Sequence, residues 1–201
     1  MFFKAIVGLG NRGILYENTR HNIGFAAIDY FAHSLGYTTW KQERAMATFS
    51  IKIPQVEGNL LLVKPTGFMN LSGTPVAKIC SFYKIPSREV VIICDDISLD
   101  VGHIKITEQV GTAGHNGVKS ILEKIGPGFV RFRIGIGGKQ HPEMSLADHV
   151  LSKFSAEELE ILAKKMPNIG DNLKLLLDKG VSSAMNSANR RICEQNHIEQ
   201  P

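Results

Sequence analysis

The stretch FFKAIVGLGN at residues 2–11 decides the fold class of this chain. Its apolar run, residues 2–7, is short and nearly continuous and ends at Gly8, which is typical of a buried β-strand. A polar loop punctuated by glycines follows. Asn22 then precedes apolar residues at three-to-four spacing, which predicts a capped helix that runs through Leu35 and is closed by Gly36. A strand that leads through a loop into a helix is the building unit of an α/β sheet.

The rest of the chain continues this alternation. Apolar runs predict strands at 47–53, 60–63, 90–94, 103–107 and 130–136, and polar starts with helical spacing predict helices at 70–84 and 115–124. Ser72 or Thr74 is the expected cap of the first of these helices. Residues 155–158, Ser-Ala-Glu-Glu, form a capping box that opens a mostly helical C-terminal third, which Pro167 and Gly180 should interrupt. We therefore expect one α/β domain over residues 1–201, with a twisted, mixed and mostly parallel sheet and helices on both faces.

Composition narrows the class of protein. The chain has 201 residues, of which 43% are hydrophobic and 21% charged, as in an ordinary globular domain. Its apolar runs are shorter than a membrane span, and its first residues lack the features of a secretion signal. Three cysteines without paired spacing predict a reducing, cytoplasmic location. The net charge of +4 is compatible with a polyanionic partner without requiring one.

Residues 8–13, GLGNRG, spell the G-x-G-x-x-G pattern of dinucleotide-binding proteins. That pattern requires a helix that starts inside the glycines, and here polar residues 18–22 come first. It also requires an acidic residue about 20 positions further on at the end of a strand, and the nearest candidate, Asp29, lies in the predicted helix. We therefore interpret these glycines as a sharp turn from which Asn11 projects.

Polar residues suited to catalysis follow several of the predicted strands. Asn11 and His21 follow the first strand, Asp95 ends the strand at 90–94, and other candidates lie at loops or helix starts: Asn70, His115, Asn116. If they converge, a carboxylate bonded to one imidazole nitrogen would fix the tautomer of His21 and leave the other nitrogen to accept a proton. Since the chain has no G-x-S-x-G motif, water is the natural proton donor. Asparagine amides suit an amide-containing substrate and a developing oxyanion.

Five blocks in sequence order resemble the bacterial peptidyl-tRNA hydrolases. The first is VGLGN at 7–11 with Tyr16 and TRHNIG at 19–24, and the second is KPT at 64–66 with FMNLSG at 68–73. The others are Asp95-Asp96, GHNG at 114–117 with KSI at 119–121, and RFRIGIG at 131–137. Together they cover about residues 3–138, with weaker similarity at 184–186.

The resemblance implies hydrolysis of the ester that joins a peptide to the terminal ribose of tRNA, which recycles tRNA from stalled translation. It implies His21 as the base that activates water, Asp95 as its partner, and Asn11 as the selector of N-blocked substrates. Contacts to the peptide and to the CCA end and acceptor stem of tRNA are implied for the following residues, with His115 acting directly or through water: Tyr16, Phe68, Asn70, His115, Asn116, Arg133. It implies no cofactor, no metal, no membrane and a monomer.

The chain departs from the family pattern in places. Thr107 stands near the position of an expected lysine that holds the tRNA 5′-phosphate, which leaves Arg133 as the matched member of that clamp. Lys105 or Arg12 are possible replacements, and Arg12 itself stands where the family usually has proline. Ser98 replaces a common aspartate, so the loop after Asp95 is expected to differ in shape. The resemblance also suggests a short lid at residues 144–150.

Three other interpretations stay open at the level of sequence. The first is a metal-dependent hydrolase with His21, His115 and Asp95 as ligands. The second is a cysteine hydrolase with Cys94 as the nucleophile, although its apolar strand favours a buried role. The third is an RNA-binding module without activity, whose tRNA affinity would depend on salt.

Overall fold

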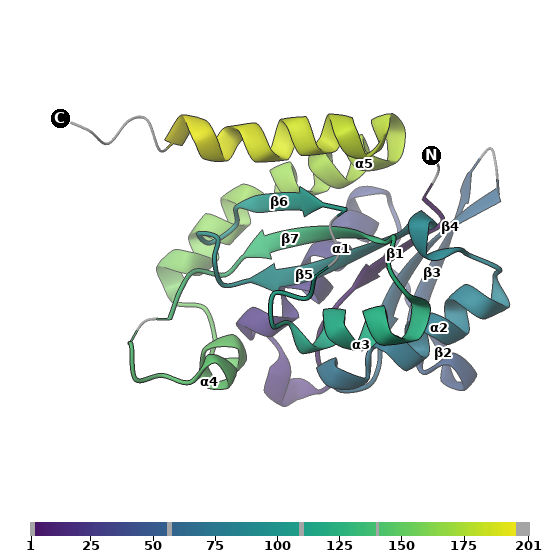
Figure 1. The fold of residues 1–201 in the computed structure, drawn as a ribbon, viewed down its shortest axis with the longest axis horizontal. Coiled ribbons are helices and arrows are strands. Elements are labelled where there is room, and N and C mark those ends of the chain that lie inside the picture. Colours follow the sequence, from purple (N-terminus) through teal and green to yellow (C-terminus); the bar gives the residue numbers. More distant parts are fainter. Residues whose placement is uncertain (1–2, 56–57, 109–110, 140, 196–201) are drawn as a thin grey trace.

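A mixed sheet forms the centre of the molecule (Figure 1). The computed structural model describes residues 3–55, 58–108, 111–139 and 141–195, with side chains up to residue 189. From one edge of the sheet to the other, the strands are β2 (Lys41–Glu43), β3 (Thr48–Gln55), β4 (Gly58–Pro65), β1 (Ala5–Gly8), β5 (Val90–Asp96), β7 (Val130–Gly135) and β6 (Ile104–Thr107).

The centre of this sheet is parallel and its flanks are antiparallel. Strands β4, β1, β5 and β7 run side by side in one direction. Strands β2 and β3 add an antiparallel flank next to β4, and β6 adds another next to β7. The expected mixed sheet is confirmed. Its parallel centre brings the carboxyl ends of four strands to one edge, where α/β proteins build their sites.

Helices cover both faces of the sheet, as predicted. Helices α1 (Ile23–Ser34) and α5 (Ala156–Gln195) pack on one face, against side chains such as Ile6, Ile93 and Phe132. Helices α2 (Gly73–Phe82) and α3 (Asn116–Ile125) pack on the other, against Val7 and Ile92. Strands β1 and β5 contribute alternate residues to the two cores. This explains why both read as continuous apolar runs.

The C-terminal third is helical, but one of its two predicted breaks is wrong. Pro167 lies inside α5, which continues through it. The proline removes one backbone donor, yet the helix still packs the fully buried Ile169 and Leu173 against the core, and this burial favours continuation. Gly180 does interrupt the helix, because its φ of 79° and ψ of 179° are not helical.

Predicted caps are only partly confirmed. The capping box at the start of α5 is present, since Ser155 Oγ accepts from the Glu158 N–H and Glu158 Oε2 accepts from the Ser155 N–H. Asn22 and Ser72 lie at the N-cap positions of α1 and α2, but neither side chain caps its helix. Ser72 instead donates to the Met69 carbonyl, and the predicted helix at 70–84 is divided into a 3₁₀ turn, η4 (Met69–Leu71), and α2.

The glycines of the G-x-G-x-x-G stretch allow close packing. A side chain on Gly8 would lie 2.5 Å from the Gly24 carbonyl oxygen, and one on Gly10 would lie 2.7 Å from the Phe25 ring. Since α1 begins only at Ile23, the glycines do not open a helix. They let the first turn of α1 approach the end of β1, which places the Asn11 and His21 segments side by side.

Among the described residues, no helix combines the length and the apolar character that a membrane crossing requires.

Candidate active site

A cleft of about 710 Å³ opens at the carboxyl ends of the central strands. Loops after β1 and β4, the end of β5, strand β7 and the start of α3 all contribute to its wall. Every site residue predicted from the sequence lines this one cleft: Asn11, Tyr16, His21, Phe68, Asn70, Asp95, His115, Asn116, Arg133.

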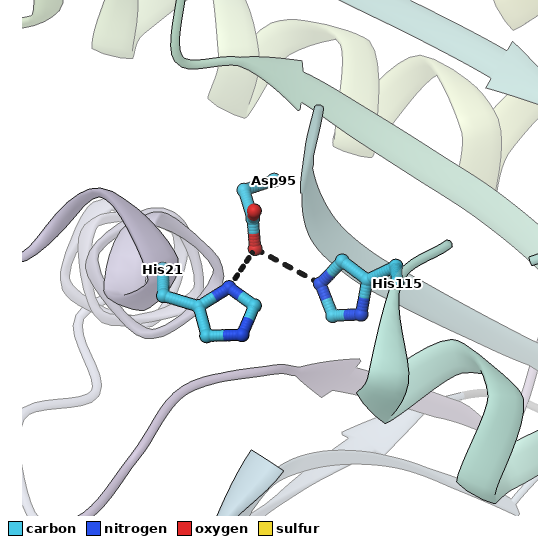
Figure 2. Close-up of side chains that lie close together, drawn as sticks. All are labelled: His21, Asp95 and His115. Carbon is cyan, nitrogen blue, oxygen red and sulfur yellow. Dashed lines mark hydrogen bonds and ion pairs between the residues drawn. The ribbon is translucent and has the colours of Figure 1, made fainter. Parts of the chain in front are cut away.

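The centre of the cleft holds an aspartate between two imidazoles (Figure 2). His21 lies in a 3₁₀ turn, η2 (Arg20–Asn22), and its Nδ1 is 2.7 Å from Asp95 Oδ1. His115 Nε2 is 2.9 Å from the same oxygen. His21 is 9% exposed and Asp95 6%, so both groups are largely shielded from bulk water. These three residues are the candidates for catalysis, and we call them the catalytic cluster.

The ring of His115 is fixed from both sides. Its Nδ1 accepts hydrogen bonds from the backbone N–H groups of Gly117 and Val118, so the imidazole caps α3. The proton of a neutral ring must then be on Nε2, where it is donated to Asp95. His21 likewise donates its Nδ1–H to Asp95, which leaves its Nε2 free to accept a proton. Of these two imidazoles, therefore, only His21 keeps a ring nitrogen without a hydrogen-bond partner among the described residues.

Asp95 is held in its charged form. Burial by itself would raise the pKa of this carboxyl, but the interactions with His115 and His21 outweigh burial and hold the pKa well below its usual range. A charged carboxylate can orient the His21 ring and stabilise the imidazolium that forms when Nε2 accepts a proton.

Asn11 is positioned by the side chain that was expected to cap α1. Asn22 Oδ1 accepts from the Asn11 N–H at 2.8 Å, and Asn22 Nδ2 donates to the Asn11 carbonyl at 3.0 Å. Asn11 Oδ1 accepts from the Met69 N–H at 2.7 Å. The amide orientation of Asn11 is therefore fixed, and its Nδ2 remains as a donor at the wall of the cleft.

Aromatic and amide side chains form the mouth of the cleft. The rings of Tyr16 and Phe68 meet edge to face with centroids 6.3 Å apart, and Phe68 is 58% exposed. Asn70 in η4 and Asn116 in the first turn of α3 are exposed and line the same cleft. An exposed aromatic pair beside free amides can stack on a base and hydrogen-bond to polar groups of a ligand.

Arg133 lies in the cleft with its guanidinium paired to Asp96. Asp96 also accepts from the backbone N–H and hydroxyl of Ser98, so Ser98 closes the turn after Asp95. Of the two candidate replacements for the missing lysine, Lys105 pairs directly across from Arg133 in the β6–β7 register. Arg12 instead stacks on Phe49, 5.5 Å from the ring centroid, and lines a separate cavity.

Sequence reasoning missed part of the cleft wall. Asp96 and Arg131 line it but were not selected as site residues. Helix α4 (Leu146–Leu151) forms an apolar side of the cleft through Leu146, Ala147, Val150 and Leu151. The expected lid segment at 144–150 overlaps α4. The sequence signal for this helix was its capping serine, because Ser145 Oγ accepts from the Asp148 N–H.

The geometry also bears on the alternative chemistries. Cys94 is 2% exposed, and burial raises the pKa of its thiol far above the usual range, so a thiolate nucleophile is disfavoured. Donor atoms of His21, Asp95 and His115 lie within 4.8 Å of one another and could serve as metal ligands. His21 Nδ1 and His115 Nε2 both hydrogen-bond to Asp95, so a metal that used these nitrogens would have to replace both bonds.

Known proteins match the chain along nearly its full length. The family model for peptidyl-tRNA hydrolase matches residues 5–196. A peptidyl-tRNA hydrolase from Clostridium botulinum (strain Alaska E43 / Type E3) is 39% identical, over 92% of this chain and 94% of the relative. One from Chlorobaculum tepidum is 40% identical, over 94% of this chain and 100% of the relative. A crystal structure of peptidyl-tRNA hydrolase from Acinetobacter baumannii superposes with a TM-score of 0.85 at 34% identity, covering 93% of this chain and 94% of that one.

The structural match shows that the fold is shared over 93% of the chain. The matches also exceed what a shared fold alone would give, because sequence identity and structural similarity extend over the same residues. The chain belongs to the peptidyl-tRNA hydrolase family, whose members are enzymes that hydrolyse peptidyl-tRNA.

Proposed function

We propose that this chain hydrolyses the ester between a peptide and the terminal ribose of tRNA with His21 as the general base. The observation that carries the proposal is the 2.7 Å bond from His21 Nδ1 to Asp95, which leaves Nε2 at the wall of the cleft with no hydrogen-bond partner among the residues that the structure describes. His115 is a second donor to Asp95. Both of its ring nitrogens are engaged in hydrogen bonds, so it is not the base.

The reaction follows from this arrangement. His21 Nε2 takes a proton from water, and the resulting hydroxide oxygen attacks the ester carbonyl carbon. The carbonyl oxygen becomes an oxyanion, to which a fixed amide donor such as Asn11 Nδ2 can donate. When the tetrahedral intermediate collapses, the bond to the ribose oxygen breaks, and the imidazolium returns its proton to that oxygen. The products are a free peptide and a tRNA with a free terminal hydroxyl, without a covalent enzyme intermediate.

Substrate recognition is assigned to the mouth of the cleft. We assign stacking on the terminal base to Phe68 and Tyr16, and hydrogen bonding to the peptide and the CCA end to Asn70 and Asn116. An N-blocked substrate differs from a free aminoacyl group by an amide, which can bond to the Asn11 side chain. Arg133, whose guanidinium also pairs with Asp96, and Lys105 across from it in the sheet are the cationic groups that we assign to a phosphate.

Single-turnover release of an N-acetylaminoacyl group from tRNA tests the mechanism. Wild type and His21→Ala are compared with and without a chelator, and tRNA binding and thermal unfolding are measured in parallel. We expect rapid release by the wild type in chelator and near loss of release by the variant, with binding retained. Loss of wild-type activity in chelator, restored by added metal, would favour a metal site instead.

Asn11→Ala tests substrate selection separately. If Asn11 bonds to the blocked amino end, the variant should lose rate on N-acetylaminoacyl-tRNA while its slow rate on free aminoacyl-tRNA changes little. Met69→Leu is the control, since it keeps the backbone N–H that holds Asn11 while altering the neighbouring side chain. An equal loss on both substrates would assign Asn11 to the oxyanion alone.

A further inference from the structure

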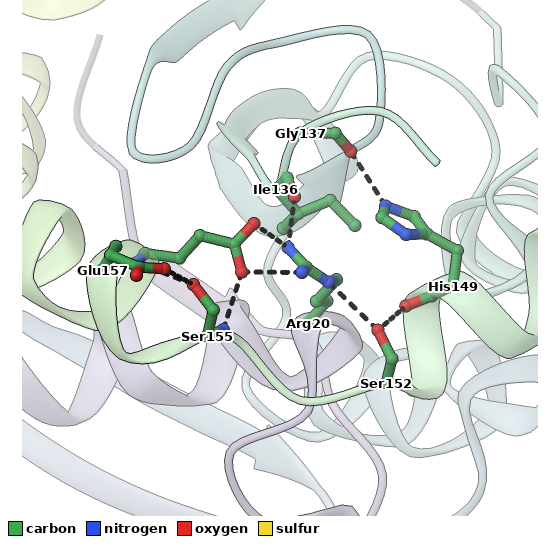
Figure 3. Close-up of polar contacts among 8 residues, drawn as sticks. Arg20, Ile136, Gly137, His149, Ser152, Ser155 and Glu157 are labelled. Carbon is green, nitrogen blue, oxygen red and sulfur yellow. Dashed lines mark hydrogen bonds and ion pairs between the residues drawn. The ribbon is translucent and has the colours of Figure 1, made fainter. Parts of the chain in front are cut away.

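Arg20 precedes His21 in the chain but serves a different part of the molecule. Its side chain is completely buried, and it does not line the cleft. Figure 3 shows that its guanidinium lies among segments that are distant in sequence. Buried arginines are uncommon and need paired donors, so the arrangement of this group is informative.

The guanidinium joins three segments. Nε donates to Ser152 Oγ at 3.1 Å, and Nη1 donates to the Ile136 carbonyl at 2.8 Å. Nη1 and Nη2 donate to the two carboxylate oxygens of Glu158, at 2.8 and 2.7 Å. The Arg20 backbone N–H also donates to the Ser152 carbonyl at 2.9 Å, and Phe154 packs under the guanidinium. Arg20 thus links η2 to the end of α4, the chain after β7 and the start of α5. We call Arg20, Ile136, Ser152 and Glu158 the Arg20 cluster.

The same contacts fix the apolar wall of the cleft. Ser152 is the C-cap of α4, and its hydroxyl donates to the His149 carbonyl. The buried His149 ring faces the Gly137 carbonyl, with Nε2 at 2.9 Å, so α4 is tied to the chain after β7 at a second point. Since Val150 and Leu151 line the cleft, any movement at Ser152 moves this wall relative to His21.

We propose that Arg20 is a positioning residue that sets His21 and the α4 wall at a fixed separation around the substrate. This inference rests on the proposed role of His21 as the base. A buried ion pair is weak support for stability, because desolvation offsets its attraction, but a planar guanidinium that makes bidentate bonds fixes direction. A misplacement of about 1 Å in a reacting group can cost roughly 10²-fold in rate, so a rigid link of this kind affects turnover.

Glu158 keeps the link charged. Burial by itself would raise the pKa of this carboxyl, but the hydrogen bonds from Arg20 and the Ser155 N–H lower it below its ordinary value. Glu158 also belongs to the capping box of α5, which provides a matched control. Ser155→Ala removes the hydroxyl of the box while leaving the Arg20–Glu158 pair in place.

The first test compares Arg20→Lys with Ser155→Ala, using the full chain and N-acetylaminoacyl-tRNA. Lysine keeps the charge but cannot make the bidentate bonds. We expect Arg20→Lys to lower the single-turnover rate about 10- to 100-fold with substrate affinity changed about twofold or less. Ser155→Ala should keep the wild-type rate. A folded Arg20→Lys protein with the wild-type rate would overturn the proposal.

A second test separates positioning from general loosening of the fold. Arg20→Lys is combined with His21→Ala, and the slow residual rate is measured. If Arg20 acts through His21, its substitution lowers the rate of the wild-type background and has no further effect in the His21→Ala background. Equal loss in both backgrounds would assign Arg20 a purely structural role. A wild-type rate in His21→Ala alone would contradict the proposed base and would be visible before Arg20 is considered.

Ser152 keeps the inference testable if Arg20→Lys does not fold. Ser152→Ala removes the acceptor of Arg20 Nε, and Ser152→Thr retains a hydroxyl at that position. We expect a several-fold loss of rate for alanine, largely restored by threonine, at unchanged affinity. Equal rates for the two variants and the wild type would contradict the link between α4 and His21.

Discussion

The catalytic cluster and the Arg20 cluster differ in how completely their hydrogen bonds are satisfied. Both originate in η2, from the adjacent residues Arg20 and His21, and both of these side chains are buried. In the catalytic cluster, His21 uses one ring nitrogen for Asp95 and leaves the other without a partner among the described residues. In the Arg20 cluster, Nε, Nη1 and Nη2 all donate to protein oxygens.

This difference shows how a reactive group can be recognised among buried polar residues. A buried polar group normally finds all of its partners, because an unmet one costs free energy. The unused nitrogen of His21 opens on a cleft, where substrate and water can supply the missing partner. The Arg20 cluster has no such opening, and its function is to hold the neighbouring residues in place. Substitutions in the catalytic cluster should therefore lower the rate with little loss of stability, whereas substitutions in the Arg20 cluster should lower the stability as well as the rate.

The largest effect is expected for His21→Ala. Loss of the general base should lower the single-turnover rate on the order of 10²–10⁴-fold. The urea midpoint of unfolding should change little, because the loss of one donor to the buried Asp95, which keeps its bond to His115, opposes the gain from removing a group selected for reactivity. Parallel measurement of rate and midpoint checks this. A large fall in the midpoint would place His21 with the structural residues and break the distinction between the clusters.

Asp95→Asn should come next. Asparagine retains the size of the side chain but offers a neutral oxygen to two imidazole donors, so the His21 tautomer is no longer fixed. We expect a rate loss on the order of 10²-fold with the fold intact. The pH–rate profile and the circular dichroism spectrum of the variant check both parts. A rate near that of the wild type would show that Asp95 is not the partner on which His21 depends.

Glu158→Gln should lower the free energy of unfolding more than the substitutions in the catalytic cluster do. It leaves a buried guanidinium short of one acceptor, which costs roughly 2 kcal/mol of unfolding free energy at neutral pH. Because the folded-state pKa of Glu158 lies below its ordinary value of 4.5, the pair contributes fully above that pH. The contribution is lost as pH falls through the folded-state pKa.

Urea unfolding of wild type and Glu158→Gln between pH 7 and pH 3 measures this dependence. The difference between the two proteins should shrink as pH falls, and subtraction removes the contributions of the other carboxylates that both proteins share. A difference that stays constant over this range would mean that the charge of Glu158 does not contribute to the stability of the Arg20 cluster.

The smallest effect is expected at the edge of the cleft, for Arg133→Ala. If Arg133 contacts one phosphate, the variant should bind tRNA more weakly, and the slope of log affinity against log salt should decrease by about one. Lys105→Ala, at the position opposite in the sheet, is the matched comparison. An unchanged slope for Arg133→Ala together with a reduced slope for Lys105→Ala would assign the phosphate contact to Lys105.

Local sequence signals predicted the elements well where burial and capping act within one segment. Apolar runs placed β5 and β7, and the Ser155 box placed the start of α5. Pro167 shows the limit of local signals, because one lost backbone bond is a smaller term than the burial of the α5 face. Asn22 shows the same limit for caps. Its position at a helix start predicted a bond to the first turn of α1, but its side chain instead bonds to the backbone of Asn11, 11 residues earlier.

The motifs also predicted residues that the structure places around one cleft, but they did not single out Arg20. Within the motif at 19–22, His21 attracts attention as a titratable group, whereas a charged neighbour ordinarily faces solvent. Its partners Ser152 and Glu158 are 132 and 138 residues away. No local sequence pattern predicts a hydrogen bond between residues so far apart in the chain. The sequence identified α4 only as a capped segment. Its apolar residues could not be assigned to the cleft wall, because the cleft exists only in the tertiary structure.

The sequence by itself determined most of the strands and helices, although not the short β2, and which chemical groups the chain offers at the strand ends. Those features depend on hydrophobic periodicity and on residue chemistry, both of which act over a few residues. Only the tertiary structure decided that Asp95 accepts from two imidazoles, that His115 is locked by a helix start, and that Arg20 ties η2 to α4. Hydrogen bonds require donor and acceptor within about 3 Å, and the packing of a parallel sheet brings such distant residues together.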